Sequence, residues 1–122
     1  MKGETVSKMD PAVKAKWLEA LRSDEYAQGT FSLRSKEDEF CCLGVLCDIA
    51  VKEGIIPEPD PGNTDYIYGR EDDAETAGLP RAVQEWSGVP LLGDRGDDHS
   101  LAYLNDQGKS FAFIADIIEE EF

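Results

Sequence analysis

The chain has 122 residues, of which 41% are hydrophobic, and its 26 acidic against 12 basic residues give a net charge of −14. This length suits one domain over residues 1–122 with one modest hydrophobic core, preceded by a flexible segment at 1–9. No apolar run approaches the roughly 20 residues that cross a bilayer, and the first residues lack the apolar stretch of a signal peptide. We therefore expect a cytoplasmic protein with no membrane partner.

A first helix is predicted over residues 10–22. Asp10 is a good capping residue, and Pro11 follows it at the first helical position, where its missing N–H is not needed. Trp17 and Leu21 belong to a set of apolar residues at helical spacing. The next segment, residues 28–34, alternates apolar and polar side chains, so we expect a short strand there.

All three cysteines lie in the most apolar stretch of the chain, residues 39–50. We expect this stretch to form a buried helix that ends at Gly54, a natural left-handed cap. The sequence has no Cys-x-x-Cys motif, and its single histidine, His99, lies in a distant acidic loop, so the thiols are predicted to be packing residues in a reducing compartment. Cys41, close to the expected start of the helix, is the thiol whose reactivity stays open.

Residues 55–78 are rich in proline, glycine and acidic side chains, which is typical of a long irregular surface loop. A short strand at 66–68 is expected within it, paired with residues 29–34. Helices are predicted at 79–87, 100–106 and 110–121, the last capped by Ser110, with a second acidic loop at 93–98. The predicted fold is a single α+β domain, mainly helical, with a short antiparallel strand pair and a central buried cysteine-containing helix.

The negative charge is concentrated after the first helix. Residues 1–36 hold seven basic and five acidic residues, for +2, whereas residues 37–122 hold five basic and 21 acidic ones, for −16. Direct binding to nucleic acid is disfavoured, because such proteins neutralise phosphates with clustered lysine and arginine. Residues 101–116 look like half of a helix-turn-helix, but an acidic end replaces its basic recognition helix. The acidity is compatible with a basic protein partner, with imitation of nucleic acid, or simply with solubility.

Catalytic and metal-binding patterns are sparse. The acidic loop and His99 offer oxygen and nitrogen ligands, but they lack the alternating pattern of a calcium-binding loop. No phosphate-binding glycine loop, nucleophile elbow or zinc-protease motif occurs. We predict no metal site, no cofactor and no catalytic residue, and a protein that is more plausibly not an enzyme.

Several short motifs follow one another in a specific order. They are Trp17-Leu18-Glu19-Ala20-Leu21-Arg22-Ser23, Tyr26-Ala27-Gln28-Gly29, Phe40-Cys41-Cys42-Leu43-Gly44-Val45-Leu46-Cys47-Asp48, Leu79-Pro80, Trp86, Leu104-Asn105-Asp106 with Gly108 and Ser110-Phe111, and Ile114-Ala115-Asp116. With these motifs the chain resembles an uncharacterised family of small proteins of tailed phages, mainly phages of actinobacteria. The resemblance implies an accessory protein made in the bacterial cytoplasm during infection, and it implies no reaction.

Two functions fit these observations. The first is a phage-encoded, non-enzymatic protein that binds and modulates a host factor or host defence, with an acidic surface that imitates a nucleic acid. Its expected binding surface consists of Glu71, Asp72, Asp73, Glu75, Asp94, Asp97 and Asp98. The alternative is a sponge for a small nucleotide-like signal, or a minor enzyme, with a site where the cysteine helix and the turns at 28–29 and 105–106 converge. Its expected lining is Tyr26, Gln28, Arg34, Trp86, Asn105 and Asp106.

Overall fold

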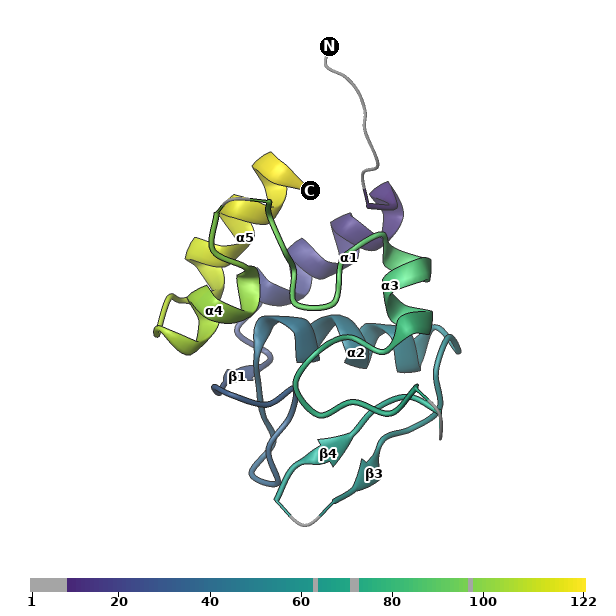
Figure 1. Ribbon diagram of the computed structural model, residues 1–122. Helices are drawn as coiled ribbons and strands as arrows, with labels where there is room; N and C mark the ends of the chain where they lie inside the picture. The colour runs from purple at the N-terminus through teal and green to yellow at the C-terminus, as the bar shows by residue number, and fades with distance from the viewer. Residues whose placement is uncertain (1–8, 63, 71–72, 97) are drawn as a thin grey trace.

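The computed structural model describes residues 9–62, 64–70, 73–96 and 98–122, and this part of the chain forms an α+β fold that is mainly helical, as predicted. The helices are α1 (Pro11–Arg22), α2 (Cys42–Lys52), α3 (Arg81–Ser87), α4 (Leu101–Asp106) and α5 (Phe111–Glu121). The strands are β1 (Ala27–Gln28), β2 (Glu39–Phe40), β3 (Asp60–Pro61) and β4 (Tyr66–Ile67). Figure 1 shows the other helices on one side of α2, and the loops that carry β3 and β4 on the other.

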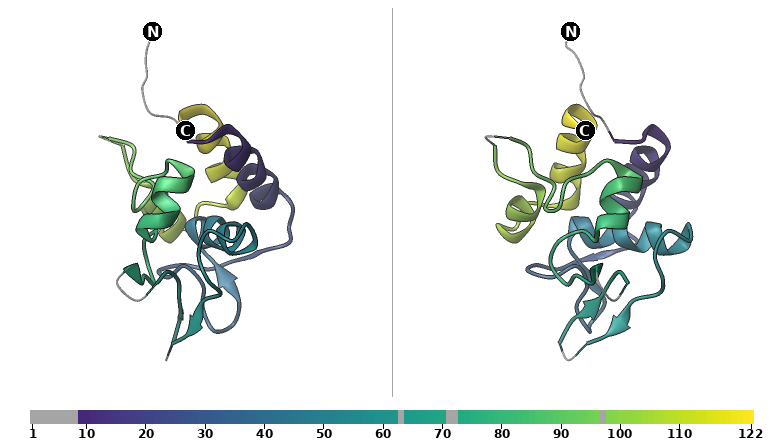
Figure 2. Two further views of the ribbon diagram at one scale, coloured as in Figure 1. Left: turned by 90° about the vertical axis from the view of Figure 1, so that its right-hand side faces the viewer. Right: turned by 45° about the vertical axis from the view of Figure 1, so that its right-hand side comes forward.

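The first helix has the predicted start and end. Asp10 caps it, because its Oδ1 atom accepts hydrogen bonds from the backbone N–H groups of Ala12 and Val13 at 2.8 and 3.2 Å. The buried face of α1 contains Val13, Trp17 and Leu21. This face packs on α2, while α1 also lies against α5, as both views in Figure 2 show.

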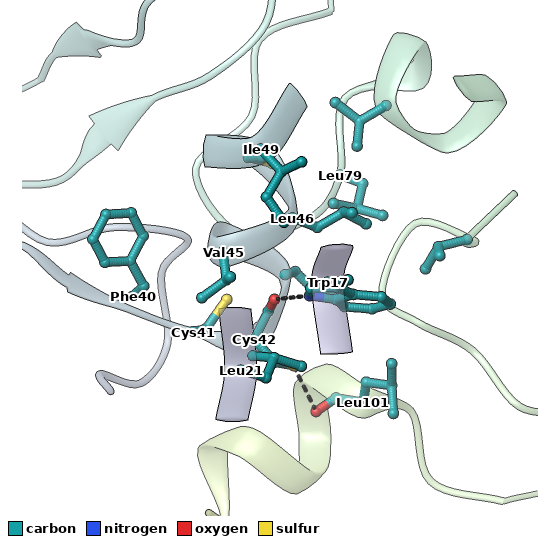
Figure 3. Close-up of a cluster of buried hydrophobic side chains, with 14 of the residues drawn as sticks. Trp17, Leu21, Phe40, Cys41, Cys42, Val45, Leu46, Ile49, Leu79 and Leu101 are labelled. Atoms are coloured by element: carbon teal, nitrogen blue, oxygen red, sulfur yellow. Dashed lines mark hydrogen bonds between the residues drawn. The ribbon is translucent and has the colours of Figure 1, made fainter. Parts of the chain in front are cut away.

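The cysteine helix α2 is the centre of the core, as predicted. Eight of its 11 residues are buried, and Cys41 occupies the capping position just before it. The indole Nε1–H of Trp17 donates to the carbonyl oxygen of Cys42 at 2.9 Å, and the Cys42 thiol lies 3.7 Å from the carbonyl oxygen of Leu101 (Figure 3). Gly54, with a φ of +79°, follows its end. The helix is therefore tied to both α1 and α4.

The predicted strand over residues 28–34 is wrong. Only residues 27–28 form a strand, and they pair in parallel with β2, in the register Gln28 opposite Phe40. The chain turns at Phe31, whose φ is +69°, and Leu33 then enters the core with no exposed surface. Leu33 is held by single backbone bonds, from its N–H to Thr76 O and from Cys41 N–H to its carbonyl oxygen. Alternating polarity here reflects a turned loop and not a pleated strand.

A strand at Tyr66–Ile67 is present, but its predicted partner is wrong. It pairs in antiparallel fashion with β3, with Asp60 opposite Ile67 and Pro61 opposite Tyr66. Backbone pairing of this strand with the earlier segment consists of one bridge between Ser35 and Asp65 and of the Tyr66 N–H, which donates to the carbonyl oxygen of residue 34 at 2.9 Å. Pro59 just before β3 and Pro61 within it account for its shortness, because proline supplies no N–H to a ladder.

The three C-terminal helices also form where they are predicted. Gly88 ends α3 in the left-handed conformation, with a φ of +86°. The hydroxyl groups of Ser100 and Ser110 cap α4 and α5 by accepting from the N–H groups of Tyr103 and Phe113. Across the described ranges, no helix combines the length and hydrophobicity needed to cross a membrane.

Candidate functional site

Three distant segments meet at Asn105, which is fully buried at the end of α4. Its Oδ1 atom accepts hydrogen bonds from the Cys42 N–H at 3.1 Å and from Gln28 Nε2 at 3.0 Å. Its Nδ2 group donates to the carbonyl oxygen of Gly29 at 2.7 Å, and Gln28 Nε2 donates also to the carbonyl oxygen of Lys109 at 2.7 Å. We call this set of bonds the Asn105 hub. It joins the start of α2 to the turn at 28–29 and to the end of α4.

The neighbouring residue, Asp106, holds an exposed aromatic ring in place. Its Oδ1 atom accepts the backbone N–H of Phe31 at 2.7 Å. Phe31 has a φ of +69° and a side chain that is 75% exposed. In the described residues, the other two non-glycine residues with positive φ are Asp24 and Asp38. Aspartate tolerates this conformation, whereas phenylalanine adopts it at a cost of about 1–2 kcal/mol, and such strain is found mainly at functional sites.

A hollow of about 340 Å³, which we call the Phe31 hollow, lies beside this ring. Residues that line it include Phe31, Cys41, Leu92, Ala102, Tyr103 and Asp106. Tyr103 is 44% exposed and stacks on His99, with 4.1 Å between the ring centroids. The hollow therefore combines two exposed aromatic rings, an apolar lining and one carboxylate, and its volume is near the lower end of the roughly 300–1,000 Å³ typical of ligand sites.

Cys41 contributes a thiol to this hollow, but the thiol is not activated. The side chain is only 4% exposed, and its Sγ atom accepts the backbone N–H of Gly44 at 3.4 Å. Burial raises the pKa of the Cys41 thiol to about 11, so the group is protonated at neutral pH. Burial also raises the pKa values of Cys42 and Cys47 well above the ordinary value. All three cysteines therefore behave as packing residues.

The structure distributes the six expected ligand-site residues over different places. Gln28, Asn105 and Asp106 come together as described above. Tyr26 and Arg34 are both in contact with Phe40, at ring-centroid distances of 5.0 Å from the tyrosine ring and 5.1 Å from the guanidinium carbon. Neither belongs to the Phe31 hollow. Trp86 lies in α3, which Figure 1 places toward the C-terminal end of α2, while α4 lies beside its N-terminal end.

Tyr26 and Arg34 have partners of their own. The Tyr26 hydroxyl donates to the Asp48 carboxylate, which also pairs with Lys52 at 3.1 Å. Burial, followed by the bond to Asp48, raises the pKa of Tyr26, so this phenol stays protonated at neutral pH. Arg34 pairs with Asp38 at 2.7 Å, and its guanidinium lies over the Tyr66 ring. These polar groups therefore stabilise the loops that surround β2.

The acidic residues expected to bind a partner are divided in a similar way. Asp73 caps α3, because its carboxylate accepts the N–H groups of Arg81 and Ala82 at 2.8 and 3.1 Å. The backbone of Glu75 is paired with that of Tyr68. Asp94 and Asp98 are exposed, and Asp98 lies 4.0 Å from Arg95. Predicted positions Glu71, Asp72 and Asp97 lie outside the described residues.

Two site residues, Phe31 and Tyr103, escape prediction from the sequence. The alternating pattern at 28–34 makes Phe31 look like an ordinary strand residue, and the helical pattern at 101–106 makes Tyr103 look like an ordinary helix residue. Gly29, which allows a turn, was the one local sign that the chain does not continue straight. Within the described residues, no cluster of three or more histidine, cysteine, aspartate or glutamate residues is placed to hold a metal ion.

Comparison with known proteins places the chain in one family. No curated protein and no solved structure matches it. One family model, described as Domain of unknown function (DUF8296), matches residues 9–122. Because this match covers nearly the whole chain, including every residue that lines the Phe31 hollow, the protein belongs to the DUF8296 family.

Proposed function

We propose that this protein is a phage-encoded, non-enzymatic accessory protein of the bacterial cytoplasm, which binds and modulates a basic protein of the host cell. The observation that carries the proposal is the strained and exposed Phe31 at the edge of an apolar hollow. Aromatic residues in such positions are the usual anchors of protein interfaces. The motif order given above supports the phage setting.

The charge of the protein supports a basic partner. Residues 37–122, which contain most of the Phe31 hollow, hold five basic and 21 acidic residues, for −16. A field of this sign speeds encounter with a basic surface and repels nucleic acid. In the strongest form of the proposal the protein occupies a host groove that normally binds nucleic acid. Asp94 and Asp98, which are exposed, are better placed for this role than Asp73, whose carboxylate caps a helix.

A small nucleotide-like ligand has less support. The side chains expected to bind it at the convergence point, Gln28 and Asn105, donate and accept within the Asn105 hub. Asn105 has no exposed surface. A ligand that used these groups would have to break bonds that join α2 to α4, which makes a binding surface for a protein the better interpretation.

The proposal is tested by native mass spectrometry of tagged protein recovered gently from expressing bacterial cells. We expect a co-purifying host protein whose binding, once it is identified and purified, weakens strongly between about 0.1 M and about 1 M salt, as the Debye length falls from about 10 Å to about 3 Å. Salt-insensitive binding, or recovery of the chain with only a ligand below one kilodalton, would contradict it.

Two matched variants locate the charge effect. One carries Asp94→Asn with Asp98→Asn, and the other carries Glu19→Gln with Glu25→Gln. Each variant neutralises two exposed carboxylates, but the second pair lies within residues 1–36, the segment with no excess of negative charge. We expect the first variant to bind the partner more weakly than the second. Equal loss in both would show that only net charge matters, which removes the acidic loop from the interface.

A further inference from the structure

We propose that the Phe31 hollow binds an arginine side chain of the partner protein. The inference rests on the proposed function and identifies the group that is recognised. It is drawn from three features of the hollow: aromatic rings without a cation, a carboxylate oxygen without a hydrogen bond, and an apolar lining.

The first feature appears when the aromatic rings are compared. Four rings in the described part of the chain have a cation over one face. These pairs are Arg34 with Phe40 and with Tyr66, Lys52 with Tyr26, and Lys109 with Phe113, at 5.1, 4.2, 5.8 and 5.2 Å from the ring centroids. Phe31 and Tyr103 have no lysine or arginine over them among the described residues. One face of the Tyr103 ring is covered by His99, so it is the Phe31 ring and the other face of Tyr103 that are open to a cation from outside.

The second feature is the Asp106 carboxylate. Its Oδ1 atom is bound to the Phe31 N–H, which holds both the carboxylate and the backbone that carries the ring. Its Oδ2 atom takes part in no hydrogen bond between the described residues. A guanidinium group in the hollow can donate to this oxygen, and hydrogen bonds between charged partners are about twice as strong as neutral ones.

The third feature decides between arginine and lysine. A planar guanidinium stacks on aromatic faces and is more weakly hydrated than an ammonium group, so it loses less when it leaves water. The carbon stem of arginine can lie along the apolar lining provided by Leu92 and Ala102.

The net charge of −14 makes two copies of this chain repel each other, which favours a basic partner over a second copy.

The experiment titrates isotopically labelled protein with N-acetyl-arginine-methylamide and follows the backbone amide signals by NMR. The lysine analogue serves as the matched probe. We expect saturable shifts at Phe31, Tyr103 and Asp106, with the arginine probe several-fold tighter than the lysine probe. Shifts spread evenly over the acidic surface, or equal affinity for both probes, would overturn the inference.

Two variants with matched controls assign the effect to the hollow. Phe31→Ala removes the ring, and we expect it to weaken arginine binding about two- to five-fold, the range of an exposed cation–π contact. Asp106→Asn keeps an oxygen acceptor for the Phe31 N–H but removes the charge, and should weaken binding to a similar extent. The controls are Phe113→Ala, another exposed ring, and Asp60→Asn, an exposed aspartate outside the hollow, and both should bind normally. Equal losses in the controls would contradict the assignment.

The outcome is separable from that of the proposed function. If a salt-sensitive host partner is found and binds Phe31→Ala and Asp106→Asn as tightly as the original chain, the proposed function stands and the arginine site fails. If hollow signals move with protein concentration and not with the probe, a second copy occupies the hollow and the inference also fails. Loss of partner binding in Phe31→Ala and Asp106→Asn, with normal binding in Phe113→Ala and Asp60→Asn, supports both the proposed function and the arginine site.

Discussion

The Asn105 hub and the rim of the Phe31 hollow lie next to each other and differ in almost every respect. In the hub, Asn105 has no exposed surface, and its amide makes three hydrogen bonds that join the end of α4 to α2 and to the turn at 28–29. At the rim, Phe31 is 75% exposed and adopts a left-handed backbone conformation. The hub lowers the free energy of the folded chain, whereas the rim raises it. Contacts inside the protein therefore explain the hub, and the rim requires an explanation from outside.

Consecutive residues connect these two regions. Asn105 directs its side chain toward Cys42 and Gly29, and Asp106 directs its carboxylate toward Phe31. The same helix end thus stabilises the core and positions the exposed ring. The backbone that carries the ring is thus held before a partner arrives, which reduces the entropy lost on association.

The largest effect is expected from alkaline pH, which forces charge onto the buried Cys41 thiol, next to Cys42 of the Asn105 hub. Burial raises the pKa of Cys41 from its ordinary value of 9.0 to about 11, so the folded protein holds this proton more tightly than the unfolded chain. The stability that results is fully present below about pH 9 and is lost as the pH rises toward 11, by about 3 kcal/mol for this thiol. Burial shifts the pKa values of Cys42 and Cys47 in the same direction.

Urea unfolding at a series of pH values measures this loss. Cys41→Ser is the matched variant, because a serine hydroxyl can still cap α2 but does not titrate in this range. We expect its stability to fall less above pH 9 than that of the original chain. Identical profiles for the two proteins, or a flat profile up to about pH 10.5, would show that the thiol is not held in a dry environment.

Removing the hub amide should have the next largest effect. Asn105→Ala leaves the buried Cys42 N–H and the Gly29 carbonyl group without their partner, and each unpaired buried group costs about 1–3 kcal/mol. We expect the free energy of unfolding to fall by about 2 kcal/mol or more, measured from urea denaturation. Gln107→Ala, at an exposed position just after α4, is the control and should change stability by less than about 0.5 kcal/mol. A similar small loss in Asn105→Ala would mean that the hub is not structural.

The buried core around α1 and α2, to which the Asn105 hub belongs, is the part that the sequence predicts well. Asp10 before Pro11 and the spacing of Trp17 and Leu21 are local signals, and they place α1 correctly. The apolar stretch around the cysteines places α2 at the centre for the same reason: burial on all sides requires apolar residues all round. The sequence does not show which side chains form hydrogen bonds with one another, because contacts such as Asn105 with Gln28 join residues 77 positions apart in sequence.

The rim of the Phe31 hollow could not be predicted from such patterns. Alternation at 28–34 is the same for a straight strand and for a loop that turns at Phe31, and phenylalanine rarely marks a left-handed turn. The bond that holds the turn comes from Asp106, 75 positions away. Among the acidic residues, the sequence shows a run of charge but not that Asp73 is used as a cap for α3. A feature that depends on one polar contact between distant residues produces no periodic pattern in the sequence.

The smallest expected effect is an increase in stability, and it tests most directly whether the rim of the hollow differs from the hub. Glycine adopts the φ of +69° at residue 31 without strain, and the 75% exposed phenylalanine ring buries little apolar surface. Relief of the strain outweighs the greater entropy of glycine in the unfolded chain, so Phe31→Gly should raise the free energy of unfolding by about 0.5 kcal/mol. Phe31→Ala keeps the Cβ atom and the strain, and should bring no gain.

Both variants are measured by urea denaturation and by titration with N-acetyl-arginine-methylamide in the same samples. A chain that becomes more stable as it loses its ligand is the pattern of a residue retained for binding at the expense of folding. If Phe31→Gly and Phe31→Ala are both less stable than the original chain, the ring contributes to the fold. Contacts inside the protein would then explain the rim as they explain the hub, and the main reason to place a partner at the Phe31 hollow would disappear.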